Sequence, residues 1–385
     1  MKFAINAASA RMGGAATYLQ NVLPELRRQL GADTKKNQII VWKPESVTTS
    51  GQETNGIDFR KLGADKEQLL PRLQFDQIEL PRALKAERAD VLFSSANFGT
   101  LFSPCRQILL VRNTVYFDSF YQTRIPSKKV RGMLWLQKQL SIRSMAAADA
   151  VIFPSQSMLD LAANATSGAR NNWHVNHYGA RPDIFTPAEA LPMESNPKTI
   201  RLLNVSLYCD QKNLGTMLSA AQLLNASDSQ QYQVSLTAGF YRDWSGHPAI
   251  PNFARDFELF RALEAAGLAE DSNWQSYGNL PNLYQQSDIF VFPSYTESFG
   301  HPLVEAMTAG LPIVAADTPI NREMCGDAAL YFSTFEAEDC ARAIRQVTTD
   351  ETLRVQLRAR GLAKAKYFSW EKHVKNLVSV FNSGD

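Results

Sequence analysis

The sequence predicts an α/β protein made of two doubly wound, Rossmann-like domains that face each other across a cleft. Short β-branched runs alternate with amphipathic segments of helical period, as in parallel sheets. With 385 residues, the chain is too long for one ordinary hydrophobic core. The segment 181–198 is rich in proline and polar residues, which is typical of a linker between two domains.

The first α/β run occupies residues 1–180. Its predicted strands cover 2–6, 38–42, 90–94, 107–112 and 149–153. Its predicted helices cover 14–30, 128–147 and 155–164. The stretch 44–70 is polar and contains glycine, so it predicts no definite element.

The second α/β run occupies residues 199–368. It begins with a strand at Thr199, and further strands are expected at 232–238, 288–292 and 311–315. Helices are expected at 213–225, 253–266 and 302–309. Doubly wound sheets bind ligands outside the carboxyl ends of their strands, so we expect the functional residues in the loops there.

The densest functional signal is the stretch DIFVFPSYTESFGHPLVEAMTAGLPIVAAD at 288–317. Pro302 suits the first turn of a helix that closes at Gly310. Ser298, Phe299 and Gly300 therefore present backbone N–H groups at a helix N-terminus. Such a terminus stabilises an anion, and a pyrophosphate is the ligand we expect there.

Two glutamates flank this predicted anion site. Glu297 lies in the loop after the strand, and Glu305 lies about one turn into the helix. A nucleotide sugar offers sugar and ribose hydroxyls on either side of its phosphates, and each hydroxyl can donate to a carboxylate. The alternative for each residue alone is an ordinary solvated charge, and the two glutamates favour a site only in combination with the helix start.

Two further features are candidates for phosphate contact. Lys212 stands at a helix start, where its point charge would meet a diphosphate. Gly13 and Gly14 open the first helix and could cradle a phosphate or form a tight strand–helix turn. A dinucleotide-binding site would need G-x-G-x-x-G and an acidic residue after the second strand, but Trp42 and Lys43 stand there.

The stretch PSYTESFGHPLVEAMTAGLPIVAAD resembles the signature of the retaining glycosyltransferases of group 1, also called family 4, which have the GT-B fold. Its E-x7-E pattern is met by Glu297 and Glu305. The resemblance implies that Glu297 contacts the donor sugar near its anomeric carbon and that Glu305 binds the ribose hydroxyls. It also implies that residues 1–180 bind the acceptor, that 199–368 bind the donor, and that the last helix, at 369–385, packs back on the first domain.

The resemblance assigns two further groups of donor-binding residues. The sugar and phosphates would be lined, largely through backbone, by Phe299, Gly300, His301, Leu303 and Val304. The turn beside the nucleotide base would be formed by Tyr277, Gly278, Asn279 and Leu280.

The chain departs from the family pattern at two positions. Family members carry a histidine after the strand equivalent to 107–112, whereas this chain offers Arg112, Asn113 or Asp118, and we expect Asn113 to take that role. The family also has an arginine five or six residues before the lysine, where this chain has Ser206 and Leu207. Lys212 would then carry the phosphate charge alone, or with Arg11 or Arg181.

The predicted function is hexosyl transfer from a UDP-, GDP- or dTDP-linked sugar to a glycan or lipid-linked acceptor, in cell-surface polysaccharide or lipopolysaccharide synthesis. The chain contains no Asp-x-Asp pair, so we expect no metal and no other cofactor. No carboxylate is an evident nucleophile, which favours retention by same-face displacement. The alternatives are a nucleotide-sugar epimerase and a non-catalytic nucleotide-sugar-binding protein.

Charge and hydropathy predict a cytoplasmic protein at the inner face of a membrane. Residues 1–190 contain 24 Lys and Arg against 16 Asp and Glu, while 191–385 contain 16 against 22. The basic half indicates an anionic partner, and without a nucleic-acid motif we expect headgroups or a phosphorylated lipid acceptor. The segment 116–145 mixes aromatic and basic residues. It is either a membrane-surface helix or a surface helix with Trp135 and Leu136 in the core. No stretch approaches the ~20 apolar residues of a transmembrane helix.

Overall fold

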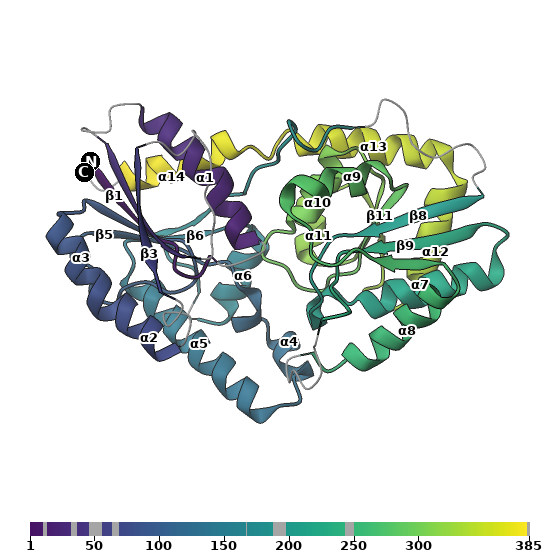
Figure 1. Ribbon diagram of the computed structural model, residues 1–385, viewed down its shortest axis with the longest axis horizontal. Helices are drawn as coiled ribbons and strands as arrows, with labels where there is room; N and C mark the ends of the chain where they lie inside the picture. The colour runs from purple at the N-terminus through teal and green to yellow at the C-terminus, as the bar shows by residue number, and fades with distance from the viewer. Residues whose placement is uncertain are drawn as a thin grey trace. The chain divides into compact units, whose positions relative to one another are not determined.

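The computed structural model describes residues 1–10, 14–31, 37–45, 56–63, 69–166, 168–187, 198–242 and 250–382 (Figure 1). The chain forms two compact units. The first comprises Met1–Phe117, Met133–Gly179 and Trp370–Asp385, and the second comprises Asp118–Gly132 and Ala180–Ser369. Each unit contains one parallel sheet with helices around it, so the predicted pair of doubly wound α/β domains is confirmed.

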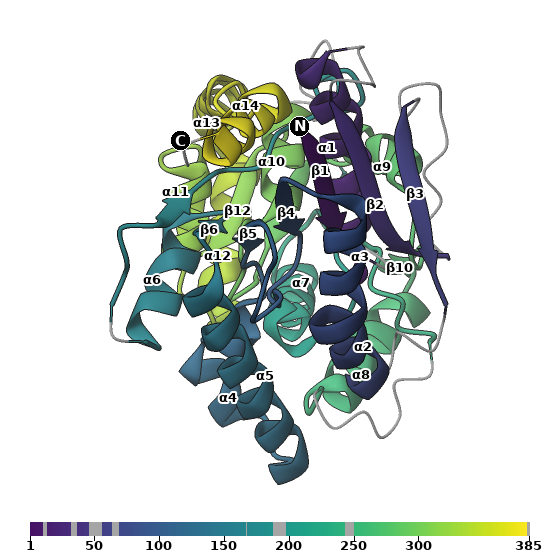
Figure 2. The ribbon, with the colours of Figure 1, turned by 90° about the vertical axis from the view of Figure 1, so that its left-hand side faces the viewer.

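The sheet of the first unit has seven parallel strands in the order β3-β2-β1-β4-β5-β6-β7. Figure 2 shows β1, β2 and β3 following one another toward one edge. The strands are β1 (Lys2–Asn6), β2 (Gln38–Pro44), β3 (Ile57–Leu62), β4 (Val91–Ser94), β5 (Arg106–Leu110), β6 (Ala150–Phe153) and β7 (Trp173–Val175). Strand order reverses at β1 and β4, which is the arrangement of a Rossmann-like sheet.

Helices cover both faces of this sheet. Figure 1 shows α1 and α14 on one side of the strands and α2, α3 and α5 on the other. The helical elements are α1 (Gly14–Leu30), α2 (Leu69–Gln74), the π-helix η3 (Phe75–Glu79), α3 (Leu80–Glu87), the 3-10 turn η4 (Thr114–Tyr116), α5 (Lys128–Ala147), α6 (Gln156–Asn164) and α14 (Trp370–Asn382). Helix α5 begins within the segment assigned to the second unit.

Helix α14 belongs to the core of the first unit. The ring of Phe381 lies 5.5 Å from that of Phe3 on β1. Nearer the start of the helix, Nε2 of His373 lies 2.9 Å from the hydroxyl of Tyr18 on α1. The last helix of the chain therefore closes one face of the sheet formed by the N-terminal residues.

The sheet of the second unit has six parallel strands in the order β10-β9-β8-β11-β12-β13. The strands are β8 (Thr199–Asn204), β9 (Gln231–Leu236), β10 (Ala269–Asp271), β11 (Ile289–Phe292), β12 (Ile313–Ala316) and β13 (Ala329–Phe332). Strands β11 and β12 are wholly buried, which explains their apolar sequences, and β8 is buried except at Thr199 and Arg201. Strand order reverses between β8 and β11.

Helices also flank the second sheet on both sides, and Figure 1 shows α10 and α13 on one side and α7 and α8 on the other. The helices are α4 (Ser119–Arg124), η5 (Asp210–Lys212), α7 (Leu214–Ser227), α8 (Phe253–Ala265), η6 (Tyr277–Asn279), α9 (Leu280–Gln285), α10 (His301–Thr308), α11 (Pro319–Cys325), α12 (Ala337–Thr349) and α13 (Glu351–Ala365). Polar residues begin several of them: Thr318 accepts a backbone hydrogen bond at the start of α11, and Asp350 does so for α13.

The stretch 44–70 contains a strand that the sequence did not predict. Strand β3 pairs in parallel with β2 at the edge of the first sheet, and of its six residues only Ile57 is buried. An edge strand with one buried residue lacks the alternating pattern on which strand prediction depends. Strand β10, at the edge of the second sheet, has no buried residue and was missed for the same reason.

Candidate functional site

Two loops of the second unit begin at the carboxyl ends of neighbouring strands. Strands β8 and β11 pair directly, with Leu202 opposite Ile289 and Leu203 opposite Phe290. The loop after β8 leads to Lys212, and the loop after β11 leads to Glu297. Both loops leave the sheet where strand order reverses, which is the place where doubly wound sheets bind their ligands.

Lys212 and Glu297 form an ion pair at this point. Their side chains are 16% and 15% exposed. Burial alone would lower the pKa of Lys212, but the nearby Glu297 carboxylate raises it above its usual value. Nζ of Lys212 also lies 5.8 Å from the ring centre of Phe292. The sequence predicted a role for each residue, and the structure brings the two together as a charged pair.

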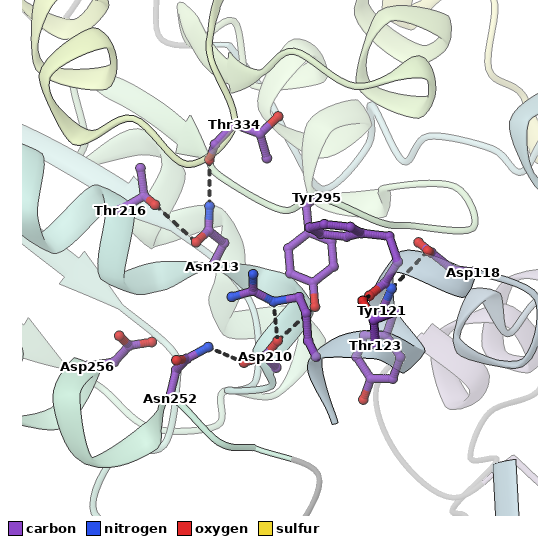
Figure 3. Close-up of polar contacts among 12 residues, drawn as sticks. Asp118, Tyr121, Thr123, Asp210, Asn213, Thr216, Asn252, Asp256, Tyr295 and Thr334 are labelled. Atoms are coloured by element: carbon purple, nitrogen blue, oxygen red, sulfur yellow. Dashed lines mark hydrogen bonds and ion pairs between the residues drawn. The ribbon is translucent and has the colours of Figure 1, made fainter. Parts of the chain in front are cut away.

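The two loops are joined by hydrogen bonds from backbone N–H and side-chain amide groups. The backbone N–H of Tyr295 donates to the carbonyl of Gln211 over 3.0 Å. Asn213, which has a φ of 50°, donates from its amide to the carbonyls of Pro293 (3.2 Å) and Thr334 (2.7 Å), and it accepts from Thr216 (Figure 3). Asparagine tolerates a positive φ better than most residues, which is the one local signal that could have identified this position.

Helix α10 begins at His301, one residue before the predicted start, with Pro302 in its first turn as expected and Gly300 as its N-cap. Gly300 has a φ of 79°, and a β-carbon there would lie 3.2 Å from Cδ1 of Leu303. The left-handed backbone therefore favours glycine, and a larger residue would also require the Leu303 side chain to shift. The backbone N–H groups predicted to meet a phosphate, those of Ser298, Phe299 and Gly300, lie in this turn.

Three of the predicted donor-binding side chains are buried in the core. Phe299 is 1% exposed, Leu303 0% and Val304 1%. The ring of Phe299 packs against His301, at 5.1 Å, and Phe368, at 5.6 Å. Contact between a ligand and these three residues would therefore use their backbone, as the resemblance implies.

Glu305 is buried within α10, with 6% of its surface exposed. Its carboxylate accepts a hydrogen bond of 2.9 Å from the hydroxyl of Tyr284 on α9. Burial raises the pKa of Glu305 to about 7, although hydrogen bonds from Tyr284 and Tyr277 act in the opposite direction. The predicted ribose ligand is thus a carboxyl that titrates near neutrality.

The turn predicted beside the base is adjacent to Glu305. It forms η6 (Tyr277–Asn279) and the first residue of α9, Leu280. Gly278 and Asn279 are exposed, whereas Tyr277 turns inward and contacts the ring of Phe185 at 5.5 Å. Tyr277 and Glu305 therefore come together, although 28 positions separate them in the sequence.

The chain has Ser206 and Leu207 where the resemblance implies an arginine, and Arg181 and Arg11 were suggested as substitutes. Ser206 is buried and donates from its hydroxyl to Asn204 over 2.8 Å. Arg181 holds Asp183 through hydrogen bonds of 2.7 to 3.1 Å. Arg11, the other suggested partner of Lys212, lies outside the described residues.

In the first unit, Gly14 is the first residue of α1, and Gly13 lies outside the described residues. Asn113 caps η4 by accepting from the backbone of Val115 at 3.4 Å. Asp118, which begins the segment assigned to the second unit, caps α4 by accepting from Tyr121 at 3.0 Å. All these positions are compatible with a structural role, and the catalytic role of Asn113 stays a prediction.

Asn97 was missed by sequence reasoning. It has a φ of 52°, and its side-chain oxygen accepts from the backbone N–H groups of Arg112 and Asn113, over 2.8 and 2.9 Å. Ser141 donates to its carbonyl over 2.9 Å. Asn97 thus fixes the chain after β5, where the resemblance implies a functional residue.

Helix α5 presents large apolar side chains to solvent: Met133 is 48% exposed, Trp135 61% and Leu136 41%. The interpretation that Trp135 and Leu136 belong to the core is therefore wrong. The helix carries five Lys and Arg residues and no Asp or Glu. Among the described residues, no helix combines the length and the apolarity that a membrane span requires.

The four cysteines are free thiols. Burial raises the pKa of Cys209, beside the site, to about 12. In the described part of the chain, no three His, Cys, Asp or Glu side chains gather in a way that could hold a metal ion.

Comparison with known proteins gives two kinds of similarity. Residues 192–364 match the family model described as glycosyl transferases group 1. The O-antigen chain mannosyltransferase B of Escherichia coli is 31% identical over 206 residues, which cover 51% of this chain and 50% of that protein. The chain thus spans about half the length of this relative.

Solved structures match the whole chain at low identity. The sucrose-phosphate synthase of Thermosynechococcus elongatus aligns with a TM-score of 0.74 and 15% identity, covering 100% of this chain and 98% of that one. Anabaena HepE, in complex with UDP and glucose, aligns with a TM-score of 0.70 and 16% identity, covering 100% of each chain. These similarities identify the fold as GT-B.

Proposed function

We propose, from the match of residues 192–364 to the family model of group 1 glycosyl transferases, that the chain is a member of that family and transfers a sugar from a nucleotide-sugar donor to a glycan or lipid-linked acceptor. The observation that carries this proposal is the Lys212–Glu297 pair at the strand-order reversal of the second sheet. A cation and a carboxylate held together there can bind the two kinds of group that a nucleotide sugar contains. The diphosphate requires positive charge, and the sugar hydroxyls require an acceptor.

In the proposed complex, the diphosphate contacts Lys212 and the backbone N–H groups at the start of α10. Glu297 would then exchange its lysine partner for a hydroxyl of the donor sugar near the anomeric carbon. Because Lys212 and Glu297 satisfy each other before the donor arrives, neither charge is left uncompensated in the empty protein.

The proposed reaction is a same-face displacement that retains anomeric configuration and needs no metal. The bond from the anomeric carbon to the diphosphate breaks as the bond to the acceptor oxygen forms, through an oxocarbenium-like transition state. The acceptor proton passes to the departing diphosphate oxygen. The protein would contribute positioning and stabilisation of the developing phosphate charge, with Asn113 as the proposed group from the first unit.

Glu305 supports the assignment of a nucleotide donor. Its carboxylate lies beside Tyr277, in the turn proposed to contact the base, and ribose hydroxyls would donate to it. The relevant donors are UDP-, GDP- and dTDP-linked sugars. Since the free carboxyl has a pKa of about 7, its ionised form would be favoured when the donor binds.

The proposed biological setting is cell-surface polysaccharide or lipopolysaccharide assembly at an anionic membrane surface. The similarity to a mannosyltransferase named for the O-antigen chain supports a role in polysaccharide or lipopolysaccharide assembly. Helix α5 supports location at an anionic membrane surface. It carries five Lys and Arg residues and no Asp or Glu, and its Met133, Trp135 and Leu136 are exposed. Basic helices with such apolar side chains lie in the headgroup region of anionic membranes.

The test combines donor binding with turnover. Thermal unfolding is measured with UDP-, GDP- and dTDP-linked sugars, since a bound donor stabilises the folded state. For the donor that binds, Lys212→Met should weaken affinity at least about tenfold, as expected when a charge-assisted phosphate contact worth ~1.5–3 kcal/mol is lost. Lys366→Met, which removes an exposed lysine of the same unit, is the matched control.

Glu297→Gln should lower kcat about a hundredfold while the donor Kd changes little, because its contact would strengthen as charge develops on the sugar. Glu258→Gln, an exposed position of the same unit, serves as its control. A kcat of Glu297→Gln equal to that of the parent would contradict the catalytic role proposed for Glu297. Conversion of the donor to an isomer without acceptor would identify an epimerase, and donor binding without any transfer or hydrolysis would identify a binding protein.

A further inference from the structure

Asp210 is a buried carboxylate at the first position of η5, two residues before Lys212. Its side chain is 0% exposed. One oxygen accepts from Asn252 over 2.6 Å, and the other accepts from the hydroxyl of Tyr295 over 2.8 Å (Figure 3). Neither donor carries a charge, so these contacts alone would leave a buried anion uncompensated.

The compensating cation is Arg124, at the end of α4. Its Nε donates to the Asp210 carboxylate over 3.3 Å, and its side chain is 30% exposed. The segment that carries α4, Asp118–Gly132, lies in sequence between two strands of the first unit but packs as part of the second unit. A charge within the candidate site is thus balanced by a residue 86 positions earlier in the chain.

Aromatic rings fix the position of this guanidinium. Its central carbon lies 5.0 Å from the ring centre of Phe335, 5.5 Å from that of Tyr295 and 5.6 Å from that of Phe120. The three rings also contact one another, with centroids 5.5 to 5.6 Å apart. Arginine stacks on such faces while its N–H groups remain directed at a carboxylate, and lysine cannot reproduce both contacts.

Tyr295 connects this cluster to the proposed donor site. Its hydroxyl donates to Asp210, its backbone N–H donates to Gln211, and it stands two residues before Glu297. Asp210 belongs to the same short turn as Lys212. A displacement of Asp210 or Tyr295 would therefore move one member of the Lys212–Glu297 pair relative to the other.

We propose that Arg124 is a positioning residue for the Lys212–Glu297 pair, acting through Asp210 and Tyr295. This inference rests on the proposed glycosyl transfer. Arg124 touches neither member of the pair in the structure, so its effect is expected on the geometry of the reacting donor more than on donor affinity. The segment Asp118–Gly132 would thus complete the donor site of the second unit, to which it belongs.

The test substitutes Arg124 with methionine and with lysine in the full-length protein. Arg124→Met preserves apolar packing in the aromatic cage but removes the charge. We expect kcat to fall about 10- to 100-fold, as misplacement by about 1 Å can do, with the donor Kd raised less than about threefold. Arg124→Lys should recover part of kcat. Added guanidinium should raise the activity of Arg124→Ala but not that of Arg360→Met, which loses an exposed guanidinium of the same unit.

A double substitution tests the route through the pair. In a Lys212→Met background, Arg124→Met should have little further effect on kcat, because the residue it positions is already gone. Additive losses from the two substitutions, or a kcat of Arg124→Met equal to that of the parent, would overturn the inference. If the parent protein binds no nucleotide sugar and transfers none, the proposed function fails and this inference fails with it. If the parent protein transfers sugar but Arg124→Met has an unchanged kcat, the inference about Arg124 fails while the proposed function stands.

Discussion

Tyr284 donates its hydroxyl to the buried carboxyl of Glu305 over 2.9 Å, joining α9 to the helix that begins at the candidate site. Burial dominates the electrostatics of this contact and raises the pKa of Glu305 to about 7 from a usual value of 4.5. The folded protein therefore holds a proton on Glu305 at pH values where the unfolded chain has lost it. This difference gives stability a definite dependence on pH.

We expect Glu305 to make the protein less stable as the pH rises from about 4.5 to about 7. In that range the folded state binds more protons than the unfolded state, so the free energy of unfolding falls as protons are removed. At about 1.36 kcal/mol for each pKa unit, the full effect is about 3 kcal/mol. Urea unfolding at pH 5 and pH 8 should show this loss in the parent and not in Glu305→Gln. Equal losses in both proteins would contradict it.

The Lys212–Glu297 pair predicts a second stability effect. Lys212→Met should lower the free energy of unfolding by about 1–3 kcal/mol, because Glu297, only 15% exposed, then lacks its cation. The double variant Lys212→Met with Glu297→Gln should recover part of this loss, since no charge is left unpaired. Urea denaturation of the parent, both single variants and the double variant gives the coupling energy. A coupling near zero would show that the pair does not contribute in solution.

A third prediction concerns the turn at Gly300. Alanine there would take a φ of 79° and place its β-carbon 3.2 Å from Leu303. We expect Gly300→Ala to destabilise the protein by about 1–3 kcal/mol, the usual cost of a strained backbone conformation. It should also weaken binding of a nucleoside diphosphate, because the N–H groups of this turn would be displaced. Gly132→Ala, outside the proposed donor site, is the control, since a β-carbon there meets no atom within 4 Å. Equal stabilities of the two variants would refute the preference for glycine.

Much of the candidate site could be predicted because its signals are local. Pro302 and Gly310 delimit α10 in the sequence, and the glutamate spacing then places Glu297 before the helix and Glu305 within it. The partners of these residues could not be predicted in the same way. Tyr284 meets Glu305, Lys212 meets Glu297, and Asp210 meets the neighbouring Tyr295 only through contacts between segments about 20 to 90 positions apart. Nothing in the local pattern around α4 indicates that Arg124 balances a buried charge of another segment.

Helix α5 shows a different limit of sequence reasoning. Its period predicted a helix at 128–147, as observed, but did not decide which apolar residues are buried. Leu134 is 8% exposed, whereas its neighbours Met133 and Trp135 are 48% and 61% exposed. Burial depends on which neighbouring elements cover the helix, and that information lies outside its own sequence.

The exposed face of α5 predicts binding to anionic membranes. The parent protein should sediment with vesicles that contain phosphatidylglycerol, and less so at high salt, because each lysine or arginine near such a surface contributes about 1 kcal/mol. The variant Trp135→Ser with Leu136→Ser should bind about a hundredfold more weakly, since two large apolar contacts contribute about 3 kcal/mol. Phe102→Ser, which alters an 88% exposed ring outside the helix, is the control. Undiminished sedimentation of the double variant would exclude α5 as the contact.

The last prediction concerns His373, which joins α14 to α1 and to His177 within the first unit. Its Nε2 lies 2.9 Å from the hydroxyl of Tyr18, and its Nδ1 lies 3.0 Å from the carbonyl of His177. A neutral ring satisfies both contacts by donating from Nδ1 and accepting at Nε2. Burial lowers the pKa of His373 to about 4 from a usual value of 6.5, although the hydrogen bonds to backbone carbonyls raise it.

Acidification from about pH 6.5 to about pH 4 should therefore lower the free energy of unfolding of the first unit. Over that range the unfolded chain binds a proton that the folded protein excludes, so the free energy of unfolding falls by up to about 3 kcal/mol. His373→Gln does not titrate and should lose this pH dependence, whereas His174→Gln, at an exposed position of β7, should keep it. The slope is opposite to that of Glu305, which belongs to the other unit. Hydrogen exchange of α14 and α10 at pH 4.5 and pH 7 should show protection changing in opposite directions, and parallel changes would contradict the assignment of these two titrations.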